Sequence, residues 1–221
     1  MRKIRYLPLF LLLLFSVAGL SCRSASDRTE EGLARDTSGL SAEQQDKKAL
    51  ELFKKAYEIL GDSGRKEAVP KLEALYREII DNYPKAVLTQ ECYWRLILIY
   101  LNDYSPSAYD KVESAYNAFI VRYPASQFRG EVEDAISQNY FHNGRWDAII
   151  KLYTPAVRNY IKTGKLSRPQ EMFMFAEAKL KLGDAAEAEK GYKIVIDLFP
   201  NSRQGSVSKL RLEDIGKLKN K

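Results

Sequence analysis

One histidine and two cysteines are the first residues to consider for nucleophilic chemistry in this chain. Cys92 lies in an apolar helical stretch, which favours a buried thiol over a reactive thiolate. His142 lies two residues before Gly144 at an expected helix end, where a positive imidazolium would suit the helix dipole. A Cys92–His142 nucleophilic pair is formally possible, but no neighbour in the sequence would activate the thiol.

Three acidic residues, Glu131, Glu133 and Asp134, are close enough in sequence to act as paired acids. They lie at an expected helix start, where negative charge is favourable, so we expect a solvated face there. The segment 61–64 has two glycines but lacks the lysine and the spacing of a phosphate-binding loop. With so few thiol and imidazole ligands, a metal site is not expected. We predict that the protein is not an enzyme and binds no metal or cofactor.

The first 22 residues have the pattern of an export signal. Arg2, Lys3 and Arg5 precede an uncharged apolar segment, 7–20, that is short for a membrane span. Small residues then lead to Cys22, and this ending resembles a bacterial lipobox. The resemblance implies a signal peptide at 1–21 and lipidation of Cys22, which would anchor the chain without a spanning helix. Ordinary secretory cleavage after Ser21 is the alternative.

Residues 22–44 are rich in Ser, Asp, Arg and Glu and have no periodic apolar positions, so we expect a flexible tether. Arg23, rather than Asp, follows the cysteine. That choice resembles the sorting pattern for the outer membrane, with the tethered domain facing the periplasm, although inner-membrane sorting stays open.

From residue 45 onward the chain repeats. Tyrosines recur at intervals of 40, 37 and 39 residues, each is followed seven residues later by another aromatic, and apolar residues lie four before and three after it. The four are Tyr76, Tyr116, Tyr153 and Tyr192. These offsets define one face of a helix, and a second amphipathic helix precedes each one. The pattern predicts repeats at about 45–84, 86–124, 126–161 and 167–200 within a helical domain at 45–221.

Two helices, an aromatic near the end of the second and then a proline resemble the tetratricopeptide repeat (TPR). The resemblance implies an all-α fold, a right-handed TPR-like superhelical solenoid of about four helix pairs. A C-terminal capping helix at 203–218 would cover the last apolar face with Val207, Leu210 and Leu218.

By the same resemblance, the first helix of each pair presents groove-facing positions to a partner. Trp94, Phe141 and Phe173 are the preferred contacts, unless they pack against the neighbouring repeat. The predicted partner-binding residues are Glu91, Trp94, Leu98, Asp134, Gln138, Phe141, Phe173 and Glu177. This surface lacks the Lys/Asn clamp of chaperone-docking TPR proteins, which disfavours that class of partner.

A lipobox, a tether and repeats that end in Tyr/Phe-Pro-x-Ser/Ala resemble the TPR lipoproteins of the β-barrel assembly machinery, the BamD family. The residues that carry the resemblance are Cys22, 83–86, 123–126 and 199–202. It implies an adaptor at the outer membrane whose partners are β-barrel assembly subunits or unfolded outer-membrane protein segments. The family has five repeats, whereas we count four. Alternatives are a Tol-Pal cell-division or pilus-assembly scaffold, or a regulator of a peptidoglycan enzyme.

The net charge of +6 invites a nucleic-acid interpretation until the charges are located. Removal of the signal peptide takes away three basic residues and leaves 32 basic against 29 acidic residues, or +3. Residues 203–221 hold six basic and two acidic residues, so the rest of the mature chain is close to neutral. We therefore expect no nucleic-acid partner.

Overall fold

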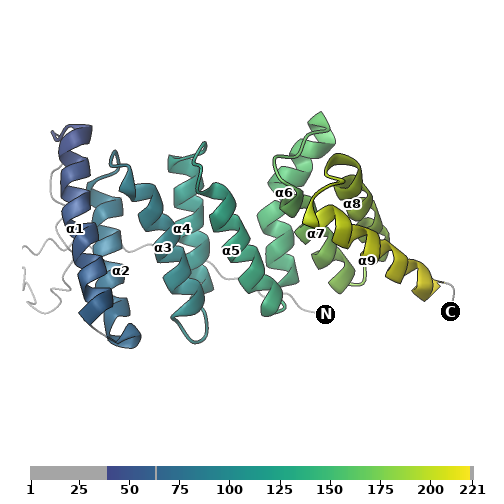
Figure 1. Cartoon of the computed structure of the whole chain (residues 1–221), viewed down its shortest axis with the longest axis horizontal. Coiled ribbons are helices and arrows are strands. Elements are labelled where there is room, and N and C mark those ends of the chain that lie inside the picture. Colours follow the sequence, from purple (N-terminus) through teal and green to yellow (C-terminus); the bar gives the residue numbers. More distant parts are fainter. Residues whose placement is uncertain (1–38, 63, 220–221) are drawn as a thin grey trace, which may run out of the picture. The chain divides into compact units, whose positions relative to one another are not determined.

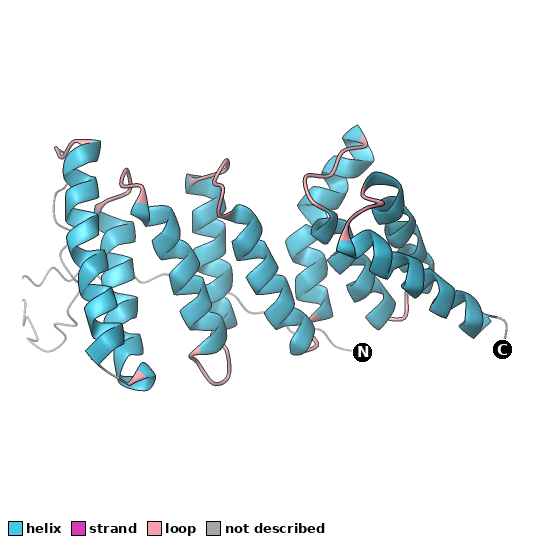
Figure 2. Cartoon of the chain, viewed as in Figure 1, coloured by secondary structure: helices cyan, strands magenta, loops and turns pink. Residues whose placement is uncertain are grey.

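The computed structural model describes residues 39–62 and 64–219 of the chain (Figure 1). These residues form helices joined by short loops and contain no strand (Figure 2). No helix in this part of the chain combines the length and the apolar character that a bilayer crossing requires. The expected signal peptide, Cys22 and most of the expected tether lie outside the described residues.

Nine helices follow one another through the described ranges. They are α1 (Ala42–Asp62), α2 (Arg65–Asn82), α3 (Leu88–Asn102), α4 (Tyr109–Arg122), α5 (Arg129–His142), α6 (Trp146–Thr163), α7 (Pro169–Lys181), α8 (Ala185–Leu198) and α9 (Arg203–Lys219). The first of them begins inside the segment expected to be a tether. Ser41 and Gln44 cause this earlier start, because each side chain bonds the other's backbone N–H, at 3.2 and 2.8 Å.

The helices pack as four antiparallel pairs with a ninth helix at the end. We call α1, α3, α5, α7 and α9 the A helices, and α2, α4, α6 and α8 the B helices. Each A helix contacts the next A helix, whereas no two B helices in the described residues approach each other closely. The chain is an all-α, TPR-like solenoid in which the A helices lie side by side along one face.

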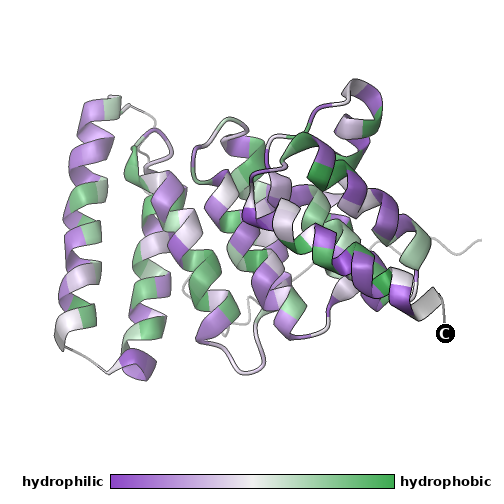
Figure 3. Cartoon of the chain, turned by 45° about the vertical axis from the view of Figure 1, so that its right-hand side comes forward, coloured by the Kyte–Doolittle hydropathy of each residue, from purple (hydrophilic) through white to green (hydrophobic). Residues whose placement is uncertain are grey.

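The tyrosines that define the repeat lie in the core. Tyr76, Tyr116, Tyr153 and Tyr192 are all buried, one in each B helix. Figure 3 shows hydrophobic and hydrophilic residues interspersed along the helices, the pattern of amphipathic helices. Burial of a large aromatic at each B helix explains why one residue type is repeated at this spacing.

Glycines close two of the turns between A and B helices. Gly144 and Gly183 have φ of +67° and +85°, a left-handed conformation that other residues adopt only with strain. Gly164, with φ +70°, ends α6 in the repeat that lacks the terminal proline. A glycine with positive φ therefore follows the C-terminus of A helices and of a B helix alike.

The final helix, α9, buries a different face from the one expected. Gly205, Ser208 and Ile215 are buried against the solenoid, whereas Leu210 is 58% exposed. A Cβ on Gly205 would lie 2.4 Å from the carbonyl oxygen of Phe199, so close backbone packing selects this face of α9. The expected position of Leu210 in the cap is wrong for that reason.

Ion pairs join successive A helices at the C-terminal end of the solenoid. Arg168 at the start of α7 reaches back to Glu133 in α5, at 2.7 Å. Arg211 in α9 reaches back to Glu177 in α7, at the same distance. Both carboxylates are almost fully buried, and each also accepts a bond from a B-helix tyrosine at 2.7 Å. These contacts fix the spacing of the A helices that form the candidate site.

Candidate functional site

The residues considered for catalysis do not assemble into a reactive site. Cys92 is fully buried as a free thiol in α3, and burial raises its pKa, so the nucleophilic thiolate is disfavoured. His142 is exposed at the end of α5, with Nδ1 2.7 Å from the carbonyl oxygen of Gln138. No hydrogen bond joins the two residues in the part of the chain that the structure describes. An all-helical TPR fold is typically a non-enzymatic scaffold.

The acidic residues at the start of α5 are less exposed to solvent than the sequence predicts. Glu131 is exposed, but Glu133 is 3% exposed and Asp134 is half-buried. Arg129 and Arg168 each donate to Glu133 at 2.7 Å, and Arg168 also donates to Asp134 at 2.9 Å. Burial of Glu133 is tolerated because both carboxylate oxygens accept charged hydrogen bonds.

A small hollow on the A-helix face collects half of the predicted partner-binding residues. The hollow measures about 180 Å³ and lies between α5, α7 and α9. We call it the A-helix groove, and its lining residues are Gln138, Phe141, His142, Phe173, Met174, Glu177 and Arg211. Gln138, Phe141, Phe173 and Glu177 were chosen from the sequence, and the structure brings them together.

The aromatic side chains of this groove are held in place by neighbours. Phe141 packs edge-on against Trp146, with ring centroids 5.1 Å apart. Phe173 lies against Tyr192, with centroids 6.1 Å apart. Both remain partly exposed, so they pack in the core and still present an apolar surface to the groove. The two roles weighed for these aromatics, packing and contact, are therefore compatible.

Glu177 forms the floor of the groove and is held by hydrogen bonds. It is 2% exposed and accepts bonds from the Tyr192 hydroxyl at 2.7 Å and from Arg211 Nε at 2.7 Å. Its negative charge is therefore neutralised within the protein. The exposed parts of the groove, with Gln138 at the rim, are left to make contacts with a partner.

The other predicted groove residues lie elsewhere in the structure. Glu91 pairs with Arg95 at 2.6 Å in α3, and Leu98 is half-buried in the same helix. Trp94 stacks on Phe128, with centroids 6.1 Å apart, so it bridges two repeats. Asp134 lines a separate polar cavity between α5, α6 and α7. The eight residues thus divide among three places on the solenoid.

Arg211, His142 and Met174 belong to the groove and were not predicted. Arg211 follows Glu177 by 34 residues, close to one repeat length, and the sequence offered that spacing as a signal. His142 directly follows Phe141, and Met174 follows Phe173, so both enter the groove as helical neighbours. No group of three or more metal-binding side chains occurs among the described residues.

Comparison with known families gives one match. Residues 172–202, which span most of α7, all of α8 and the turn after it, match the tetratricopeptide repeat family. No curated protein and no solved structure matches the chain. The match covers the fourth helix pair, which carries one wall of the A-helix groove.

Proposed function

We propose that the protein is a lipid-anchored TPR scaffold of the bacterial envelope that acts as an adaptor in the assembly of outer-membrane β-barrel proteins. TPR repeats generally mediate protein–protein interactions, and the TPR-type fold of this chain carries that general role. The observation that supports a binding role most directly is the A-helix groove, where Phe141 and Phe173 stay partly exposed over a fixed floor. Extended or helical segments of partners bind concave grooves of this kind.

The envelope location rests on the sequence. Cys22 at the end of an apolar export signal supports lipidation, and the terminal Tyr/Phe-Pro-x-Ser/Ala pattern supports the resemblance to the BamD family. The partners in this proposal are β-barrel assembly subunits or unfolded outer-membrane protein segments. The lipid would hold the solenoid at the outer membrane, facing the periplasm.

Fractionation tests the anchor. The wild-type chain should sediment with outer-membrane vesicles and carry acyl chains on the peptide that contains Cys22, whereas Cys22→Ala should leave the membrane fraction. A Cys22→Ala protein that still fractionates with membranes would contradict lipidation at this residue.

Co-purification tests the adaptor role. The tagged wild-type chain should recover the central β-barrel assembly subunit, and Gln138→Lys and Phe173→Ala should reduce that recovery at least fivefold. Gln138 is an exposed rim residue, so its replacement should leave the fold intact. Ile161→Ala, which removes a 77% exposed apolar side chain from α6, is the matched control and should have no effect.

Depletion of the protein should lower the levels of folded outer-membrane proteins. Unchanged levels would refute the role in β-barrel assembly and leave the general scaffold role standing. Recovery of a different envelope complex, again sensitive to Gln138→Lys, would reassign the partner while keeping the groove.

A further inference from the structure

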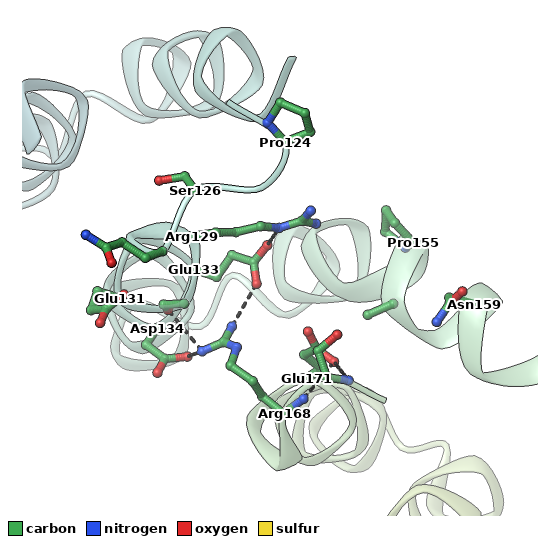
Figure 4. Close-up of a pocket in the computed structure, with 14 residues that line it drawn as sticks. Pro124, Ser126, Arg129, Glu131, Glu133, Asp134, Pro155, Asn159, Arg168 and Glu171 are labelled. Carbon is green, nitrogen blue, oxygen red and sulfur yellow. Dashed lines mark hydrogen bonds and ion pairs between the residues drawn. The ribbon is translucent and has the colours of Figure 1, made fainter. Parts of the chain in front are cut away.

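Two hollows lie next to each other where α5 meets α4, α6 and α7. The first, which we call the ion cavity, measures about 630 Å³ and lies between the start of α5, the second half of α6 and the start of α7 (Figure 4). The second, which we call the apolar hole, measures about 180 Å³ and lies between α4, α5 and α6. Arg129 and Pro155 line both hollows, so the two are adjacent.

The ion cavity has more negative than positive charge. Arg129 and Arg168 are its two cationic groups, and Figure 4 shows both directed at Glu133. Four carboxylates face these two cations, which gives a formal charge of −2. They are Glu131, Glu133, Asp134 and Glu171.

The charges inside the ion cavity are only partly satisfied. Glu133 uses both oxygens on arginines, with a further bond from Tyr116. The carboxylate of Glu131 makes no hydrogen bond or ion pair with any described residue. Glu171 accepts two backbone bonds, at 3.2 and 3.3 Å, through one oxygen alone. The second oxygen of Glu171 and the carboxylate of Glu131 are thus left to receive a cation.

Burial disfavours the ionised form of two of the acidic groups. The pKa of Asp134 and the pKa of Glu171 are both raised, first by burial and further by neighbouring carboxylates, although Arg168 acts in the opposite direction. A raised pKa means that the ionised carboxylate is disfavoured where it stands. A cation entering the cavity would reverse that penalty, so the cavity favours a positively charged group over an anion.

The apolar hole beside it can hold a side chain. Its volume is several times the roughly 30 Å³ that one water occupies in the liquid. Most of its walls are apolar or aromatic, and they include Val112, Tyr116, Ile120, Ile136, Leu152 and Pro155. An apolar group placed there would lose its contact with water, which is favourable at about 25 cal/mol per Å² of buried surface.

We propose that the ion cavity and the apolar hole together form a docking site for a segment of a partner protein in which an apolar side chain lies beside a lysine or arginine. The apolar side chain fills the hole, and the basic side chain enters the adjoining ion cavity, where the carboxylates of Glu131 and Glu171 attract it. This site is built from both A and B helices and is separate from the A-helix groove. The scaffold can therefore hold two partner segments at once, and this proposal does not depend on the first.

A random peptide library displayed on phage tests the preference directly. The purified full chain in detergent serves as the bait, and the selection is repeated with Glu131→Lys. Peptides enriched only on the wild-type chain should carry Leu, Ile, Val or Phe within two residues of Lys or Arg. Enriched peptides that lack this pairing would overturn the proposal.

Fluorescence anisotropy with the labelled selected peptides then locates the site. Glu131→Lys reverses an exposed charge at the ion cavity, and Asn117→Trp covers the apolar hole from its exposed rim. Each should raise the Kd at least tenfold. The matched controls are Asp197→Lys on α8 and Ala74→Trp on α2, which introduce the same two side chains at exposed positions outside both hollows. They should leave the Kd within twofold of the wild-type value.

Four further results would overturn the proposal. Equal weakening by Asp197→Lys would show a general charge effect, and full competition by free spermidine at equal concentration would show that charge alone binds. Weakening by Gln138→Lys instead would place the peptides in the A-helix groove, which contradicts this site and supports the first proposal. A concentration-dependent dimer that excludes the peptides would make a second copy of the chain the occupant.

Discussion

The carboxylate of Glu73 in α2 offers the sharpest test of the physical reasoning, because four neighbours converge on it. It accepts bonds from the hydroxyls of Tyr104 at 2.6 Å and Tyr100 at 2.9 Å. Lys111 and Arg77 donate to it, both at 3.2 Å. These contacts tie α2 to α3 and to the segment that leads into α4. Neutralising the carboxylate should therefore weaken the packing of the first repeat against the second.

The magnitude follows from the pKa of Glu73. Burial would raise this pKa, but the hydrogen bonds from the two tyrosines and from Lys111 outweigh burial and lower it from 4.5 to about 2. At 1.36 kcal/mol per pKa unit, the ionised form stabilises the fold by about 3 kcal/mol at pH 7. The lysine and arginine partners are about half exposed, so solvent screening reduces the expected value to about 1–3 kcal/mol.

The sign of the pH dependence is fixed by the direction of the shift. Because the folded pKa lies below the unfolded one, the stabilisation is complete above about pH 5 and is lost as the pH falls through 4.5 toward 2. By the same linkage, about 1.4 of the full 3 kcal/mol remains at pH 3. The wild-type chain and Glu73→Gln should therefore differ most at neutral pH and converge in acid.

Urea unfolding followed by circular dichroism at pH 7, 5, 4 and 3 measures the difference in the free energy of unfolding. Glu78→Gln on the same helix is the control, because the carboxylate of Glu78 makes no hydrogen bond or ion pair among the described residues. This substitution should cost less than about 0.5 kcal/mol. A difference between wild type and Glu73→Gln that stays constant from pH 7 to pH 3 would refute the reasoning. So would a difference below about 0.5 kcal/mol at pH 7.

Three further predictions address packing and reactivity. Gly191→Ala should lower the thermal midpoint of unfolding, because the new Cβ would lie 2.8 Å from the Cβ of Ala176. The cost of overpacking, about 1–3 kcal/mol, outweighs the gain in helix propensity of roughly 1 kcal/mol. A higher midpoint would contradict this prediction. Glu177→Ala should cost about 2 kcal/mol and speed hydrogen exchange in α9, since Arg211 loses its acceptor, and unchanged exchange would count against the coupling. Burial raises the pKa of the Cys92 thiol, so iodoacetamide at pH 8 should modify it in urea and not in the native protein, as peptide mass mapping would show.

The repeating helical pattern could be predicted because its cause is local. Tyr76 and its three counterparts lie on one helix face with their apolar neighbours, and the 3.6-residue period places them there whatever the rest of the chain does. The A–B turns at Gly144 and Gly183 are local in the same way, because a left-handed residue is needed to end the helix. The choice of Gln138, Phe141, Phe173 and Glu177 as groove-facing residues followed from the resemblance to TPR repeats.

The ion cavity could not be predicted, because its charges come from helices far apart in sequence. From its position at a helix start, Glu133 is expected to be exposed to solvent. It is instead buried, and its partners include Tyr116, 17 residues earlier, and Arg168, 35 residues later. Periodicity carries no information on which arginine will reach a given carboxylate. The exposure of Leu210 was likewise decided by the close approach of Gly205 to the preceding turn.

The sequence by itself thus determined the helices, their pairing and the face that each B helix buries, since these follow from interactions within a few residues. Tertiary structure alone decided how far α5 stands from α4 and α6, and so whether hollows open between them. It also decided which buried carboxylates are neutralised, because the Coulomb energy of Glu133 depends on distances to groups of other helices. The candidate binding sites of this protein therefore depend on contacts between helices that are far apart in sequence.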